Sequence, residues 1–562
     1  MRWFIVFLIL IVLPLGVAQH PTTLVTGKFA QATREWLPAE RVPKVTPQTR
    51  ATDRFGHTFI VSSRGVVIQH ASGERHQLEG MPWWNVTSVA MATNGDVWFG
   101  SPRGAARWRG GQVEVYAGKR WLADDRVEAI APQADGSVIV ISKGGATRLV
   151  WRTMKLADKA DHYEQLTDAR HKRFGYVTGA TLLDPLRPDQ SKVTPHIDDN
   201  DGLWTAMYVA AESFRYAVTK SPDALRKARE SMRAVLDLEK KTGLPGFPAR
   251  ALTNKSEPDF GKPRGGEWHL TADQEWEWKG DTSSDEMDGH FFVWPIYYDL
   301  VADDREKADI RATCRRVMDR IIRDGFYLLD LDGKPTTWGV WAPEKINDDP
   351  DWRNEKGLNA LELLAYLKAT EHITGDAKYA RVAHELITKH HYAQNTLMQK
   401  VLPGDFPDAE NNHSDDELAF LSYYPLLRYE TDPSLRAIYL ASLERSWQIA
   451  RPEASPFMNF IYGALTGRPC DSEASVRALE EIPLDLVHWL MTNGFRLDLQ
   501  RDSEPDRFGR PQLRVPLPWR ERPLHKWNGN PYVIDGGGDR SEECGTFWLL
   551  PYWMARWHGI IR

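Results

Sequence analysis

The larger part of this chain repeats one unit, a pair of consecutive helices, and this repeat restricts the possible folds more than any other feature. From Thr153 onward, apolar residues recur with helical spacing. In each pair the first predicted helix is apolar and aromatic, and the second is amphipathic, charged and often opened by an Asp or Ser-Pro cap. The predicted pairs are 202–219 with 222–242, 286–301 with 303–323, 356–374 with 376–391, 415–429 with 433–450 and 458–465 with 474–493, followed by a last helix over 546–558.

Repeated helical hairpins can close into an α/α toroid, with the apolar helices inside and the amphipathic helices outside. We therefore expect residues 155–562 to form such a toroid and to carry the functional site. The fold class is then mixed and mainly α, because a small β module precedes the toroid.

Residues 50–150 follow a different pattern, in which short strands alternate with Gly, Asn and Asp turns. Two stretches that begin at Val86 and Val127 repeat a theme 41 residues apart, a period typical of propeller blades. Residues 116–118 and 122–127 resemble the two-component-regulator propeller repeats of bacterial sensor proteins. The resemblance covers about two to three blades, too few to close a ring. It implies a propeller-like module for docking or scaffolding.

The first residues predict export. Arg2 precedes an apolar stretch over 3–17, and small residues at 16–18 suit signal peptidase, so residues 1–18 are a predicted signal peptide. The stretch is shorter than a membrane span. We expect a secreted or periplasmic protein with no membrane contact after cleavage. The net charge of -6 is spread along the chain, so we expect no nucleic-acid partner, and three cysteines are too few for a disulfide framework.

A polar cluster precedes or opens most of the apolar helices. In a toroid the inner helices run parallel, so these clusters should converge around one cavity mouth. N-capping explains part of them, because Ser, Asp and Asn bond free backbone N–H groups and acids suit the helix dipole. Capping requires neither two or three acids in a row nor His, Arg and Trp beside them. The clusters are 196–201, 281–286, 353–356, 411–417 and 539–543.

With this hairpin pattern and cluster placement, the helical part resembles the six-hairpin glycosidase and toroid-lyase architectures of carbohydrate enzymes. No family motif accompanies the resemblance, so it implies a substrate class, a polysaccharide or oligosaccharide, more than a mechanism. The 23 Trp fit that class, because aromatic faces in polar loops can stack on sugar rings. We expect no cofactor and no metal: there is no H-E-x-x-H, and Asp198, Asp199 and Asp201 lack EF-hand spacing.

Glycoside hydrolysis needs two carboxyl groups that flank the scissile bond, one as acid and the other as nucleophile or base. Asp199 and Asp285 are the first predicted catalytic pair, because each starts an adjacent inner helix. Asp416, Glu417 and Glu543 are further candidates.

Polysaccharide β-elimination is the alternative, and it needs a base and a donor that neutralises a uronate carboxylate. His413 would be base or acid, with Tyr423 or Tyr424 as its partner, and Asn411, Asn412 and Arg353 would complete the set. Under either mechanism we expect substrate contacts from Asp198, Trp204, Trp278, Arg353, Asn412, Tyr423, Trp527 and Arg540. A non-catalytic glycan-binding or sensory protein, suggested by the propeller resemblance, is the third alternative.

Overall fold

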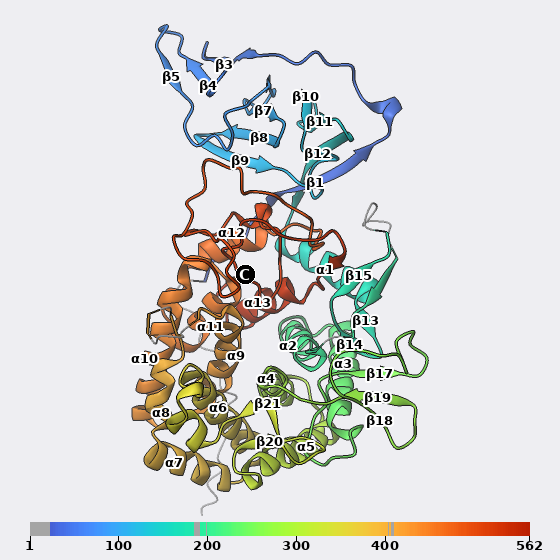
Figure 1. Ribbon diagram of the computed structural model, residues 1–562, viewed down its shortest axis with the longest axis vertical. Helices are drawn as coiled ribbons and strands as arrows, with labels where there is room; N and C mark the ends of the chain where they lie inside the picture. The colour runs from blue at the N-terminus through green and yellow to red at the C-terminus, as the bar shows by residue number, and fades with distance from the viewer. Residues whose placement is uncertain (1–22, 185–191, 198, 403, 406–409) are drawn as a thin grey trace, which may run out of the picture.

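The computed structural model describes residues 23–184, 192–197, 199–402, 404–405 and 410–562. The predicted signal peptide, residues 1–18, lies outside the described residues. Figure 1 shows strands at one end of the molecule and a ring of helices at the other. Within the described ranges, no helix is long and apolar enough to cross a bilayer.

Six helices form the inner ring of the helical part. Each packs against the next, and the last returns to the first, so the ring closes (Figure 1). Neighbours cover these helices on all sides; Ala206 to Ala210, for example, are all buried. In order the helices are α2 (Asp201–Thr219), α4 (Ser284–Leu300), α6 (Lys356–Thr374), α9 (His413–Tyr429), α11 (Pro456–Thr466) and α13 (Thr546–Trp557).

The outer helices bury one stripe each. In α5 the buried residues include Ile310, Cys314, Val317 and Ile321, the spacing of a single helical face. Side chains cap the starts of α3, α5 and α10; the Ser221 hydroxyl, for example, accepts from the Ala224 N–H at 3.4 Å. The outer helices are α1 (Leu156–Arg170), α3 (Pro222–Lys240), α5 (Asp304–Arg323), α7 (Lys378–His390), α10 (Pro433–Ala450) and α12 (Ser472–Glu481).

Two features of the ring differ from the predicted helices. The outer partner of α13 is α1, which precedes the other helices in sequence, so the chain closes its ring by joining its last helix to its first. The helix predicted over 474–493 ends at Glu481 as α12. Pro483 explains the early end, because a proline disfavours helical backbone at the preceding residue.

The N-terminal part contains three four-stranded antiparallel sheets. Strands β7 and β11 begin 41 residues apart, at Val97 and Val138, which matches the predicted repeat. The first strand of the middle sheet, β6, packs against β2 and β10 of its neighbours, and the described sheets do not form a closed ring. The sheets are β2 (Arg50–Thr52), β3 (Thr58–Ser62), β4 (Gly65–Gln69), β5 (Arg75–Gln77); β6 (Ser88–Met91), β7 (Val97–Ser101), β8 (Gly104–Arg109), β9 (Gln112–Tyr116); and β10 (Val127–Pro132), β11 (Val138–Ser142), β12 (Gly145–Met154), β1 (Phe29–Leu37).

Residues 482–545, between α12 and α13, join the two parts. This segment is mostly irregular and lies between the strands and the ring (Figure 1). Lys119 pairs with Asp539 at 2.8 Å, and the Trp121 indole donates to the Arg520 carbonyl at 3.1 Å. The sheet that contains β10, β11 and β12 also includes a strand that precedes the predicted module of residues 50–150. This strand, β1, pairs with β12 along its full length.

Short strands complete the helical part and lie in the connections between helices. They are β13 (Lys172–Arg173), β14 (Tyr176–Val177), β15 (Ala180–Leu182), β16 (Val193–Pro195), β17 (Leu252–Asn254), β18 (Trp268–Leu270), β19 (Trp276–Lys279), β20 (Tyr327–Leu329), β21 (Pro335–Val340) and β22 (Ser541–Glu542).

Candidate functional site

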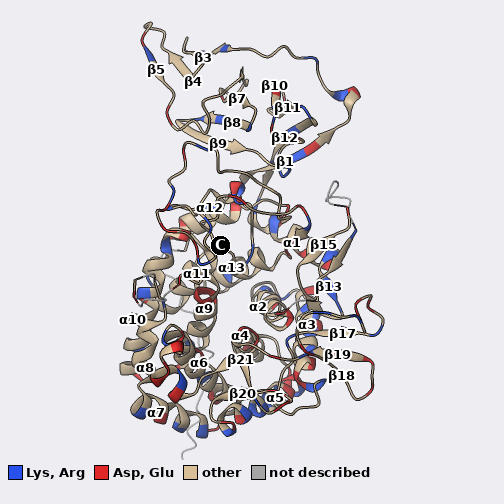
Figure 2. Cartoon of the chain, viewed as in Figure 1, with Lys and Arg blue, Asp and Glu red and all other residues tan. Residues whose placement is uncertain are grey.

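The starts of three inner helices line one cavity, which we call the acidic cavity. Its volume is about 420 Å³. Acidic residues lie on α2, α4 and α9 around the centre of the ring (Figure 2). The cavity is lined by the carboxyl groups of Asp285, Glu355, Glu410, Asp415 and Asp416, by the amides of Asn354, Asn359, Gln399 and Asn412, and by Trp338 and Arg507.

Asp285 belongs to the first turn of α4, where the capping residues fix its position. The Ser283 N–H donates to Glu286 at 2.9 Å, and the Asp285 N–H donates to the Ser283 hydroxyl at 3.1 Å. This is a capping box, and Glu286 fills the acidic role in it. Asp285 is therefore not the capping carboxylate; it lines the cavity and accepts a hydrogen bond from the Ser283 hydroxyl.

Asp415 belongs to the first turn of α9. Asn412 caps this helix through the Ser414 N–H, at 3.2 Å, and its amide donates to the Asp415 carboxyl group at 2.6 Å. Burial raises the pKa of Asp415 well above its ordinary value, and the negative charges of Glu355, Asp416 and Asp285 raise it further. The pKa of Glu355 is also raised by burial, with Arg507 acting in the opposite direction.

Asp416 is buried beside Lys400, whose ammonium contacts its carboxylate. His413 lies behind it, with Nδ1 at 3.4 Å from Glu453 Oε1 and 3.9 Å from Asp416 Oδ2. Possible metal-ligating atoms of these three side chains lie within 4.8 Å of one another. Lys400 already supplies a cation to Asp416, so the group has the form of a buried ion network, and we assign no metal to it.

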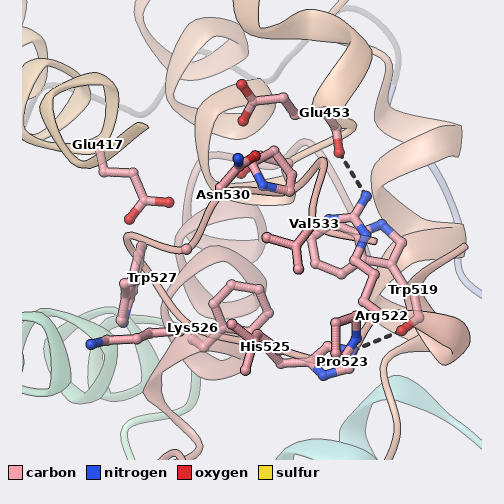
Figure 3. Close-up of a pocket in the computed structure, with 15 residues that line it drawn as sticks. Glu417, Glu453, Trp519, Arg522, Pro523, His525, Lys526, Trp527, Asn530 and Val533 are labelled. Carbon is pink, nitrogen blue, oxygen red and sulfur yellow. Dashed lines mark hydrogen bonds between the residues drawn. The ribbon is translucent and has the colours of Figure 1, made fainter. Parts of the chain in front are cut away.

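A second, smaller pocket lies where residues 519–533 cross the starts of α9 and α11. Figure 3 shows Glu417, Glu453, Lys526 and Trp527 around it. Burial raises the pKa of Glu417 well above its ordinary value, with further contributions from Glu453 and Asp416. The volume of this pocket is about 40 Å³, compared with about 420 Å³ for the acidic cavity.

Only one residue of the first predicted catalytic pair, Asp199 and Asp285, lines the acidic cavity. Asp285 lines the acidic cavity, whereas Asp199 does not. The exposed Asp199 pairs with Lys279 at the end of β19. Partial burial would raise the pKa of Asp199, but the hydrogen bond from Lys279 holds it below its ordinary value. Asp198 lies outside the described residues.

Three other predicted residues lie outside the acidic cavity. Glu543 approaches His488, with Oε1 at 3.3 Å from the ring Nε2. Trp204 lies near Lys526, whose ammonium is 5.7 Å from the indole centroid. Trp527 lines the smaller pocket, but it is 4% exposed and packs edge-on against Phe457.

Two predicted substrate contacts lie in the core, and we correct both assignments. Trp278 is 2% exposed, and its ring packs against Phe247 and His269, so it offers no face to a sugar. Tyr423 is fully buried, and its hydroxyl bonds Ser442 at 2.6 Å. Neither residue is among those that line the acidic cavity.

The other predicted residues take local roles. Arg353 donates from Nε to the Pro350 carbonyl at 2.8 Å. The backbone carbonyl of Arg540 accepts from the Leu182 N–H, and its side chain is exposed. The Tyr424 hydroxyl bonds His558 at 2.8 Å, away from the mouth.

The cavity contains residues that the sequence did not single out as site residues. Asp415 and Glu355 lie within the predicted polar clusters. The sequence therefore marked their positions but did not distinguish them from the other acids of those clusters. Trp338 was visible as a tryptophan in a polar loop. Arg507 lies in the irregular segment before α13, and no local pattern links it to the starts of α4, α6 and α9, which lie more than ninety residues earlier in the sequence.

Comparisons with known proteins yield structural likenesses alone. A scan against protein-family models and a search of curated proteins found no match. A sugar epimerase from a ruminal bacterium is 11% identical, with a TM-score of 0.38 over 71% of this chain and 97% of that one. A family 76 glycoside hydrolase from a bovine Bacteroides thetaiotaomicron strain is 9% identical, with a TM-score of 0.39 over 84% and 98%. A thermostable endoglucanase from Alicyclobacillus acidocaldarius is 12% identical, with a TM-score of 0.38 over 84% and 98%. At this level of similarity, none of them assigns the chain to a family.

Proposed function

We propose that the chain is an exported glycoside hydrolase that cleaves a polysaccharide or oligosaccharide in the acidic cavity. One observation carries the proposal. Carboxyl groups from the starts of α4, α6 and α9 meet in a cavity of about 420 Å³, within the range typical of ligand pockets. The predicted signal over residues 1–18 is retained as the route of export.

Asp415 is the proposed general acid. Hydrolysis requires a carboxylic acid that still holds its proton near neutral pH and gives it to the leaving glycosidic oxygen. Burial and three neighbouring carboxyl groups raise the pKa of Asp415 well above its ordinary value, which keeps that proton available.

Asp285 is the proposed nucleophile or base. It lies in the first turn of α4, where the helix dipole stabilises negative charge, and the Ser283 hydroxyl donates to its carboxylate. It therefore either attacks the anomeric carbon or takes a proton from the attacking water. Glu355 lies in the same cavity and contributes to the raised pKa of Asp415, so it is a positioning residue in this scheme.

Trp338 is the proposed sugar platform at the cavity wall. It is 50% exposed, and its ring lies 6.4 Å from that of Trp352. Its strand β21 is tied to the residues before α4, because the Thr337 N–H and hydroxyl donate to Asp281 at 2.7 and 3.0 Å. An exposed indole in the same cavity lining as Asp285 suits the apolar face of a sugar.

We favour hydrolysis over β-elimination for a structural reason. Elimination would use His413 and Tyr423 as its proton-transfer pair. His413 faces Glu453, and the Tyr423 hydroxyl bonds Ser442 inside the core. Neither side chain lines the acidic cavity.

The test is incubation of the mature chain with a panel of neutral and uronic polysaccharides, with reducing ends and ultraviolet absorbance followed together. Hydrolysis produces reducing ends without absorbance, whereas elimination produces both. Asp285→Asn and Asp415→Asn should abolish the release, and Asp199→Asn, which changes a carboxylate outside the cavity, should not. Wild-type activity in either cavity variant would place the reaction elsewhere. Glycan binding with no cleavage across the panel would favour a binding protein.

A further inference from the structure

A second cavity lies at the junction of the β module and the helical ring; we call it the junction cavity. Its walls come from β1, from the connection between β9 and β10, from α1 and from residues 483–487. Its volume is about 280 Å³. It shares no lining residue with the acidic cavity.

Arg120 is the unusual residue of this cavity. It is 2% exposed, and its guanidinium donates to the Arg522 carbonyl at 2.5 Å and to the Val487 carbonyl at 3.3 Å. His525 Nδ1 lies 3.4 Å from a terminal nitrogen of the same guanidinium. The buried Nε of Arg120 has no hydrogen-bond partner among the described residues. All of these contacts are with uncharged groups or atoms, so no carboxylate bonds this buried cation.

Such a cation is costly without a counter-charge, because burial removes its hydration. Burial lowers the pKa of Arg120 to about 10, even though Asp485 acts in the opposite direction. Asp485 is engaged elsewhere, since it accepts from Arg34 at 3.3 Å and from the Trp489 indole at 2.8 Å. Among the described residues, the cation therefore has no carboxylate of its own.

The rest of the lining defines what would fit beside Arg120. Arg170 donates to Glu542 at 2.6 Å, so both other guanidinium groups, those of Arg34 and Arg170, are paired with a carboxyl group. The lining thus holds three guanidinium groups against two carboxyl groups. Trp121, Leu166 and Leu484 add apolar surface.

We propose that the junction cavity binds a small organic carboxylate, with its carboxylate on Arg120 and its apolar body against Trp121 and Leu166. The unpartnered Nε–H of Arg120 is a charge-assisted donor for one carboxylate oxygen. The bound molecule would touch both the β module and α1, so it would strengthen the contact between the two parts. This inference does not depend on the proposed catalytic function.

The test uses the full mature chain and benzoate as the probe, a carboxylate with a flat apolar body. Benzoate should raise the Tm and bind in calorimetry, while the neutral isostere benzamide should not. Arg120→Met should weaken benzoate binding about tenfold or more, because it removes a charge-assisted contact. Arg103→Met is the matched control, since Arg103 is exposed and stacks on Phe495 outside the cavity.

Arg120 also bonds two backbone carbonyls, so Arg120→Met removes contacts within the fold as well, and a second variant is required. Leu166→Trp fills the cavity and keeps Arg120, and it should abolish benzoate binding with kcat on the glycan unchanged. The proposal is overturned if benzoate gives no Tm shift and no heat of binding, if benzamide binds equally well, or if Leu166→Trp binds benzoate as the wild type does.

Discussion

The acidic cavity and the junction cavity handle buried charge in opposite ways. The acidic cavity gathers five carboxyl groups and one guanidinium, and its acids are stabilised in part by holding protons. The junction cavity gathers three guanidinium groups and two carboxyl groups, and pairs all but one of the cations. Crowded carboxyl groups can neutralise themselves by protonation near neutral pH, whereas a guanidinium cannot lose its proton there. We therefore expect proton chemistry in the first cavity and anion binding in the second.

The largest expected effect tests the proton held in the acidic cavity. Asp415→Asn removes the proposed acid, and kcat should fall about 10³-fold, within the range for general-acid catalysis. The fold should survive, because Asn has nearly the size of Asp and is neutral, like the protonated Asp415 that the crowded site favours. Steady-state kinetics on the best glycan of the panel provide the measurement, with Asp199→Asn as the control. A kcat within about tenfold of wild type would remove Asp415 from the mechanism.

The next prediction concerns pH. The acid must be protonated, so kcat/KM should fall as pH rises through the raised pKa of Asp415. Glu355 contributes to that raised pKa, and Glu355→Gln removes its negative charge. The fall in kcat/KM should therefore occur at lower pH in Glu355→Gln than in wild type. Glu410→Gln is the control, because Glu410 is exposed and is not among the causes of the Asp415 shift. A fall in kcat/KM at the same pH as in wild type, or at a higher pH, would contradict the effect of Glu355 on the pKa of Asp415.

A smaller effect is expected at the cavity wall. Trp338→Ala removes the proposed platform, and KM should rise about five- to tenfold, which corresponds to about 1–1.4 kcal/mol, with kcat nearly unchanged. Trp338→Phe should restore most of the affinity. The control is Trp268→Ala, because Trp268 stacks on Arg264 at 3.6 Å and does not line the cavity. Loss of kcat with KM unchanged would indicate a structural role instead.

The sequence predicted the ring better than it predicted the acids. Helical periodicity reports burial directly, so the alternation of apolar and amphipathic helices was sufficient to indicate inner and outer positions. It could not show that α1 serves as the outer partner of α13, because that pairing joins opposite ends of the chain. The choice between Asp199 and Asp415 depended on side-chain direction: Lys279 holds Asp199 at the end of β19, and Asn412 holds Asp415 in the first turn of α9.

The smallest expected effect tests charge pairing in the junction cavity. Burial raises the pKa of Glu542 to about 7, and Arg170 acts in the opposite direction. A carboxyl group whose pKa is raised by folding contributes stability below its unfolded pKa, and this contribution is lost as pH rises through the folded value. The Tm of wild type should therefore fall by a few degrees more than that of Glu542→Gln between about pH 5.5 and about pH 8.5. Asp485→Asn is the comparison, because it changes the other paired carboxyl group of the lining. Parallel Tm profiles for wild type and Glu542→Gln would mean that Arg170 keeps Glu542 ionised, so that the excess positive charge at this junction does not increase at low pH.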